Sequence, residues 1–170
     1  EEGIDTGPVL LERHRTIGLL DNGHTLAERM SALTANLMVE AMPLIESAGH
    51  GSENERRERL KVIDQATRPG EASYARMLTK QDHQINWSAS ALTIHRKVMA
   101  LYPNAVTLWN DKRLKLLHCE PLIDRLREEL PDEVHPLIGR WPTGGHPPGT
   151  VLESVKGIGV VVSTNGCPIL

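Results

Sequence analysis

Short β-prone runs separated by tight turns fill much of the last 65 residues and constrain the fold most. Asn165-Gly166 is a strong two-residue hairpin signal, because both positions tolerate the positive φ that such a turn requires. Asn110-Asp111 marks a second turn of the same kind. Several short strands joined by turns predict a small β-barrel. The expected strands are 106–109, 114–119, 149–153, 159–163 and 167–170.

The first block, residues 1–51, has the pattern of a loop, a strand and a helix. The β-prone run 9–17 predicts the strand, and Thr25 with Glu28 forms a capping-box pattern that predicts the helix start. Apolar residues then recur at helical spacing, so we expect one buried helix face, with Pro43 as a point where the helix can kink. That face comprises Leu26, Met30, Leu33, Leu37, Ala41, Leu44 and Ile45.

The middle of the chain is polar and then helical again. Charges of both signs alternate after residue 48, which predicts a solvated helix or a linker, and we place the linker at 52–73. A short strand at 85–87 and a helix capped by Ser88 or Ser90 and ended by Pro103 should follow. An insertion at about 121–148 should hold a helix at 121–130 and an irregular loop.

Charge and composition limit the partners. Nineteen basic and 22 acidic residues give a net charge of −3, so nucleic-acid binding would have to come from a local patch. One candidate is the hairpin set Lys112, Arg113 and Lys115, and another is Arg13 with Arg15 on the expected first strand. Ordinary surface charge is the alternative for both sets. The absence of Phe leaves few rings for stacking bases.

The cysteines and histidines predict no metal site. Cys119 and Cys167 are the two cysteines and suit reduced thiols in the cytosol. His118 precedes Cys119 directly, and neighbours on a strand face opposite sides, so the pair should not share a metal ion. No apolar run is long enough to span a bilayer, and the sequence has the features of a fragment of a longer protein.

A carboxylate between two glycines stands just before the expected first strand, in the run Gly3-Ile4-Asp5-Thr6-Gly7-Pro8. Glycines let a backbone approach a ligand closely. The same pattern also suits an Asx-turn that only holds the loop.

Four stretches resemble the C-terminal portion of the methionyl-tRNA formyltransferase family. The run 3–10 resembles its active-site loop and following strand, and 25–30 resembles the helix start after it. The runs 74–82 and 85–88 resemble the junction between its two domains, and 149–152 with 157–160 resemble its barrel domain. The resemblance implies the α/β tail of a Rossmann-like formyltransferase domain at 1–51, followed at 74–170 by an incomplete, OB-like β-barrel domain.

The resemblance also implies a reaction and its site. Members of this family move a formyl group from 10-formyltetrahydrofolate, a co-substrate, to the amino group of methionine on initiator tRNA in translation initiation. Asp5 matches the family's catalytic carboxylate, and Thr6 and Gly7 shape its loop. The family's catalytic Asn and His and most of its folate site precede this loop and are not in the chain. We therefore expect the 170-residue chain alone to be inactive.

Two alternatives stay open. A sugar-nucleotide N-formyltransferase shares the Asp loop and the downstream domain. A nucleic-acid-binding barrel without catalysis would need none of the catalytic groups. For the leading interpretation we expect a monomer without metal or membrane contact, in the cytoplasm or in the stroma or matrix of an organelle of bacterial origin.

Overall fold

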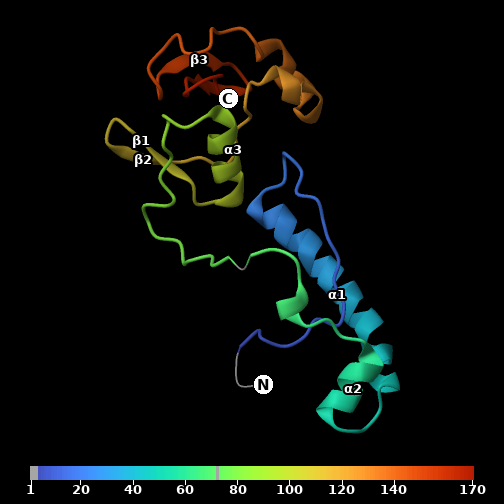
Figure 1. Cartoon of the computed structure of the whole chain (residues 1–170). Helices are drawn as coiled ribbons and strands as arrows, with labels where there is room; N and C mark the ends of the chain where they lie inside the picture. The colour runs from blue at the N-terminus through green and yellow to red at the C-terminus, as the bar shows by residue number, and fades with distance from the viewer. Residues whose placement is uncertain (1–3, 72) are drawn as a thin grey trace. The chain divides into compact units, whose positions relative to one another are not determined.

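The computed structural model describes residues 4–71 and 73–170, which divide into two compact units (Figure 1). One unit comprises Glu1–Thr16 and Ala27–Arg76, and the other comprises Ile17–Leu26 and Met77–Leu170. Gly3, the first glycine of the expected active-site loop, lies outside the described residues. None of the helices in the described part is long and apolar enough to cross a membrane.

Helix α1 (Gly23–Ser47) begins earlier than predicted, and Asn22 caps it. The Asn22 side-chain oxygen accepts hydrogen bonds from the amides of His24 at 2.9 Å and Thr25 at 3.0 Å. The Thr25 hydroxyl in turn accepts one from the Asn22 amide at 3.0 Å. The prediction of a Thr25–Glu28 capping box is wrong, because Thr25 holds the reciprocal position of a box that starts at Asn22.

The apolar stripe of α1 is only partly covered. Ala41 is the buried residue of the helix, and Leu33 and Leu37 are half-buried. Leu44 and Ile45 are exposed, although the spacing places them on the expected buried face. No β-strand is formed among the described residues of this unit, so no sheet covers the stripe.

The strand expected at 9–17 is absent. Val9 forms a single antiparallel bridge with Ile63, through hydrogen bonds of 2.8 and 2.9 Å between their backbones. The pairing stops there because the 3-10 helix η1 (Gln65–Thr67), capped by Asp64, turns the partner segment away after two residues. Residues 11–18 therefore run on without regular structure.

The polar stretch contains helix α2 (Glu53–Leu60), which buries none of its residues. Ser52 and Glu55 form its capping box, and Lys61 ends it in the left-handed conformation. The backbone and hydroxyl hydrogen bonds from Ser52 lower the pKa of the Glu55 carboxyl. A solvated helix was one of the two predictions for this stretch, and that part is confirmed.

The second unit is built on helix α3 (Ala91–Ala100). Ser90, one of the two predicted caps, caps it, and its hydroxyl accepts a hydrogen bond from the Thr93 amide at 3.2 Å. Ile94 and Val98 are buried, each worth roughly 1.5–3 kcal/mol against exposure. They form a core cluster with the buried residues Ile85, Ala91, Ala105, Cys119 and Ile169.

Two hairpins accompany α3; the first was expected as a hairpin, with its second strand at 114–119, and the strands of the second were expected at 149–153 and 159–163 without their pairing. Strands β1 (Val106–Trp109) and β2 (Lys112–Lys115) pair across a turn in which Asn110 and Asp111 have φ of 47° and 60°. Strands β3 (Val151–Val155) and β4 (Gly159–Val162) form the second hairpin.

The expected short strand at 85–87 and the expected last strand at 167–170 each appear as isolated bridges. Gln84 bridges to Val106, and Ile169 bridges to both Val162 and Pro121. The described residues thus form two separate two-stranded sheets with bridges beside them, and no closed barrel.

The insertion differs from the predicted helix at 121–130. It forms the 3-10 helices η2 (Asp124–Glu129) and η3 (Asp132–Leu137). Pro131 and Pro136 cannot donate backbone hydrogen bonds, which keeps both segments short. Val134 and Leu137 are buried against Leu122 and Val161 in a second core cluster.

Candidate functional site

The Asp5 loop is held by one side chain from elsewhere in the chain. Gln65 donates hydrogen bonds from its amide nitrogen to the backbone oxygens of Asp5, at 2.9 Å, and of Gly7, at 2.6 Å. Asp5 itself has φ of 60°, a left-handed conformation that Asp and Asn tolerate better than most residues. Thr6 and the Asp5 carboxylate are exposed. The loop therefore presents this carboxylate to solvent from a fixed backbone.

No sequence pattern points to Gln65, which lies 60 residues from Asp5. The antiparallel bridge between Val9 and Ile63 brings the two segments together. Gln65 then opens η1 beside this bridge. Only the tertiary pairing makes Gln65 a neighbour of the loop.

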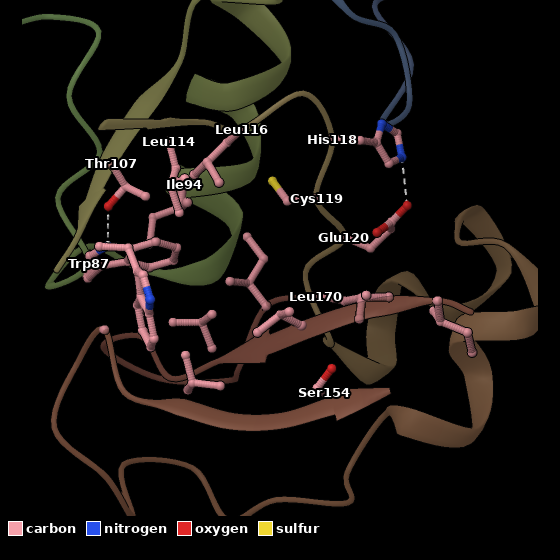
Figure 2. Close-up of a pocket in the computed structure, with 18 of the residues that line it drawn as sticks. Trp87, Ile94, Thr107, Leu114, Leu116, His118, Cys119, Glu120, Ser154 and Leu170 are labelled. Carbon is pink, nitrogen blue, oxygen red and sulfur yellow. Dashed lines mark hydrogen bonds and ion pairs between the residues drawn. The ribbon is translucent and has the colours of Figure 1, made fainter. Parts of the chain in front are cut away.

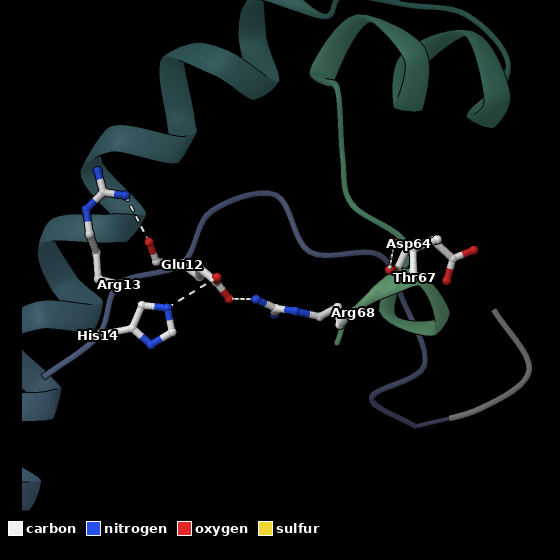
Figure 3. Close-up of polar contacts among 6 residues, drawn as sticks. All are labelled: Glu12, Arg13, His14, Asp64, Thr67 and Arg68. Atoms are coloured by element: carbon white, nitrogen blue, oxygen red, sulfur yellow. Dashed lines mark hydrogen bonds and ion pairs between the residues drawn. The ribbon is translucent and has the colours of Figure 1, made fainter. Parts of the chain in front are cut away.

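Charged side chains surround the segment that follows the loop (Figure 3). The Glu12 carboxylate pairs with Arg68, and it also lies 3.3 Å from His14 Nε2. Arg13 donates to Glu40 at 2.7 Å and to the Glu12 backbone oxygen at 2.9 Å. Half-exposed pairs of this kind contribute about 0–1 kcal/mol each. They nevertheless engage Arg13, one of the candidate phosphate contacts.

Arg15 differs from Arg13. It is exposed and has no ion pair in the part of the chain that the structure describes. Neither arginine lies on a strand, because the expected strand at 9–17 is absent. A strand would have placed both side chains on one face, and the structure does not form that strand.

The basic hairpin forms at the predicted turn, but its second strand is Lys112–Lys115 and not 114–119, so Lys112, Arg113 and Lys115 all lie on β2, where they are exposed. Strand alternation puts Arg113 and Lys115 on one face and Lys112 on the other. Arg113 also lines a hollow of about 210 Å³ together with Lys80, which the sequence analysis did not single out. The structure thus brings these cations together on one unit, while Asp5, Thr6, Gly7, Arg13 and Arg15 belong to the other unit.

An apolar pocket of about 660 Å³ lies among α3 and the two hairpins (Figure 2). Trp87 stands at one side, and its indole nitrogen donates to the Thr107 hydroxyl at 2.9 Å. Gly149 has φ of 87°, and a Cβ there would come within 3.3 Å of the Trp87 ring. Sequence reasoning missed this pocket. Its apolar lining includes Ile94, Trp109, Leu114, Leu116, Val160, Val162 and Leu170.

The polar edge of this pocket offers no activated nucleophile. Burial, with a smaller contribution from the Glu120 charge, raises the pKa of the Cys119 thiol to about 12. His118 Nε2 lies 2.6 Å from a Glu120 carboxylate oxygen. Among residues 4–71 and 73–170, no three His, Cys, Asp or Glu side chains come together as metal ligands.

Comparison with known proteins gives a family match over the second unit. The protein family described as "Formyl transferase, C-terminal domain" matches residues 77–170. The chain is 88% identical over all of its 170 residues to a protein named "Methionyl-tRNA formyltransferase" from Synechococcus sp. strain CC9311. It is 63% identical to a protein of that name from Parasynechococcus marenigrum and 51% identical to one from Prochlorococcus marinus strain MIT 9313.

These matches cover the whole chain but only part of each relative. The chain covers 50%, 49% and 50% of the lengths of these three relatives. The chain therefore spans about half the length of the curated relatives it matches.

Proposed function

The chain belongs to the family that has the formyl transferase C-terminal domain, and we propose that the longer protein containing it is a methionyl-tRNA formyltransferase. It moves a formyl group from 10-formyltetrahydrofolate to the methionine amine of initiator methionyl-tRNA, in translation initiation. One observation carries the proposal: proteins of this name match all 170 residues, at up to 88% identity. The family match over 77–170 supports it independently.

The reaction sets the chemical requirements of the site. The amine attacks the formyl carbon, a C–N bond forms and a tetrahedral oxyanion develops. The bond to the folate nitrogen then breaks, the amine gives up a proton and the folate nitrogen gains one. Preorganised donors must stabilise the oxyanion, and the resemblance assigns this work to the Asn and His upstream of this chain.

Asp5 is proposed to support this chemistry as a carboxylate. A negative charge beside an imidazole favours its protonated form, and a carboxylate can orient the ring or a water that carries the amine proton. The exposed Asp5 side chain and the Gln65 bonds to Asp5 and Gly7 support this role, because they present the carboxylate from a fixed loop. Thr6 and Gly7 are proposed to shape the loop without a chemical role.

The finer fold is also part of the proposal. We take 1–51 as the end of a Rossmann-like catalytic domain and 74–170 as an OB-like barrel domain. The exposed apolar side chains Met38, Val39 and Met42 on α1 support the first, because such a face is usually covered by further structure. The two hairpins and the bridges at Ile169 support the second.

The tRNA surface is proposed to include Lys112, Arg113 and Lys115. Their exposure supports this role, because phosphate contacts need cations that solvent can reach. Arg15 is a further candidate, whereas Arg13 would have to leave Glu40 to bind a phosphate.

The compartment and assembly are proposed from chemistry alone. Cys119 and Cys167 are free thiols, which fits a reducing compartment. We therefore place the protein in the cytoplasm, or in the stroma or matrix of an organelle of bacterial origin. A monomer without a metal ion completes the proposal.

Direct assay of the full-length protein tests the proposal. With 10-formyltetrahydrofolate it should formylate initiator methionyl-tRNA and leave an amino-sugar nucleotide unchanged. Formylation of the amino sugar alone would replace the proposal with a sugar-nucleotide N-formyltransferase. Binding of tRNA without formyl transfer to either acceptor would instead favour a non-catalytic binding module.

A further inference from the structure

The side chain of Gln65 joins two backbone positions of the Asp5 loop, on either side of Thr6. Its amide nitrogen carries two N–H groups, and each has an acceptor: the backbone oxygen of Asp5 at 2.9 Å and that of Gly7 at 2.6 Å. Reversing the side-chain amide would set its oxygen against the same two carbonyl oxygens, which is repulsive. The contact therefore depends on the two donors of a side-chain amide at this position.

The backbone of Asp5 needs a contact of this kind. Its φ of 60° lies in the left-handed region, which is unfavourable for a residue with a Cβ, although Asp tolerates it better than most. Residues in such a conformation persist where the surrounding structure holds them. The Gln65 bonds fix the carbonyl groups of Asp5 and Gly7. They thereby fix the direction in which the exposed Asp5 carboxylate leaves the loop.

Two further contacts hold the turn that carries Gln65. Before it, the backbones of Ile63 and Val9 exchange hydrogen bonds of 2.8 and 2.9 Å. After it, the Arg68 guanidinium pairs with the Glu12 carboxylate (Figure 3). The segment 63–68 is therefore anchored to the segment 9–12 on both sides of η1, and Gln65 reaches the loop from a fixed support. Catalytic groups need such support, because a displacement of about 1 Å can cost much of the rate.

We infer that Gln65 is a positioning residue of the formyl-transfer site, which aims the Asp5 carboxylate at the reacting groups through the backbone of the loop. This inference rests on the proposed function, in which Asp5 supports the chemistry. Gln65 acts without touching a substrate, because the loop engages both of its N–H groups. A misplaced carboxylate weakens the chemical step and leaves tRNA binding intact. Loss of the Gln65 donors should therefore lower kcat and leave KM for methionyl-tRNA nearly unchanged.

Single-turnover formylation of methionyl-tRNA by the full-length protein tests this role. Gln65→Met keeps the length of the side chain but has no donor, and the rate should fall about 10–100-fold, as for a catalytic group displaced by about 1 Å. Gln65→Glu should lose at least as much, because carboxylate oxygens would face two carbonyl oxygens. Ala66→Glu is the matched control, because it adds the same charge on η1 and keeps both donors. A rate for Gln65→Met within about threefold of the parent protein would overturn the inference.

Combination with Asp5→Asn shows whether Gln65 acts through Asp5. In the Asp5→Asn protein, Gln65→Met should slow the reaction further by less than about threefold, because the carboxylate that Gln65 positions is already lost. A purely structural role would lower the rate and the melting temperature equally in both backgrounds. A further loss as large as the one in the parent background would overturn the inference.

Amide hydrogen exchange of the full-length protein tests the loop contact independently of activity. Gln65→Met should make the loop 5–9 exchange roughly tenfold faster, as expected for the loss of two hydrogen bonds, and should leave α1 unchanged. Unchanged exchange of the loop would overturn the inference even in an active protein. If the loop responds but the parent protein does not formylate methionyl-tRNA, the proposed function fails and the positioning role with it, whereas the loop contact stands.

Discussion

Asn22 and Thr25 satisfy each other's backbone amides at the start of α1, through two hydrogen bonds of 3.0 Å that run in opposite directions. Removing the first residue of such a box exposes amides that have no helical partner. Asn22→Ala should therefore lower the free energy of unfolding by ~1 kcal/mol. Denaturant unfolding measures the loss.

Asn22→Ser is the matched control for the cap. Serine keeps an oxygen that can accept from the same amides, so most of the stability should remain. Equal stability of Asn22→Ala and the parent protein would show that the cap does not hold the helix.

The basic hairpin predicts a salt effect. Replacing Lys112, Arg113 and Lys115 with Ala should weaken tRNA binding by the full-length protein and flatten its salt dependence. The slope should fall by about 0.7–0.9 log units per lost phosphate contact. Lys156→Ala is the control, because Lys156 is also exposed but lies beyond β3 on the other hairpin. If the salt dependence of tRNA binding is unchanged in the triple variant, the three side chains are ordinary surface charges and do not contact phosphates.

The thiols should react at different rates. The Cys119 pKa of about 12 leaves almost no thiolate near neutral pH, and the side chain is buried. A maleimide should label the half-buried Cys167 first and label Cys119 only on unfolding. Mass spectrometry of digested samples measures both. Rapid labelling of Cys119 in the folded protein would contradict its burial.

The raised pKa of the Cys119 thiol should make the free energy of unfolding depend on pH. The ordinary thiol pKa is 9.0, so the unfolded chain loses this proton at lower pH than the folded chain does. The contribution of Cys119 is thus present below about pH 9 and is lost as the pH rises toward 12. Cys119→Ala should unfold with a weaker pH dependence in this range. If the stability of Cys119→Ala and of the parent protein falls equally with pH in this range, the Cys119 pKa is not raised in the folded protein.

Gly149 should tolerate no side chain. A Cβ there meets the Trp87 ring at 3.3 Å, and φ of 87° is strained for any L residue. Gly149→Ala should lower stability by about 1 kcal/mol or more. Gly144→Ala is the control, because that glycine also has positive φ but no atom near its Cβ position. Equal losses in both variants would show that backbone strain, and not the Trp87 contact, sets the effect.

Local signals predicted the turn at Asn110-Asp111, because the residues that decide it are neighbours in the sequence, whereas the two-residue hairpin predicted at Asn165-Gly166 is only a bridge between Val162 and Ile169. Asn110 and Asp111 take the positive φ that their turn needs, and Ser90 caps α3 as its position indicates. The start of α1 was misplaced because Asn22–Thr25 and Thr25–Glu28 are overlapping capping patterns. Only the first of them forms.

Features that depend on distant partners could not be predicted in the same way. A strand at 9–17 would need a partner strand of similar length, but only Val9 pairs with another segment, through a single bridge to Ile63. The Gln65 bonds to the Asp5 loop and the contacts of the buried His95 ring with the backbone oxygens of Cys119 and Leu19 join segments up to 76 residues apart. The match to the formyltransferase family came from residue identity at several places in the chain. Spacing or periodicity alone would not have found it.

Asp5→Asn in the full-length protein tests the central claim most directly. Asparagine keeps the size and tolerates the left-handed φ of 60°, so the loop should stay intact while the charge is lost. Single-turnover formylation of methionyl-tRNA at saturating substrates should slow about 10²–10⁴-fold, with binding and melting temperature unchanged. A rate within about threefold of the parent protein would remove Asp5 from the catalytic groups, since general acid–base groups contribute far more than that.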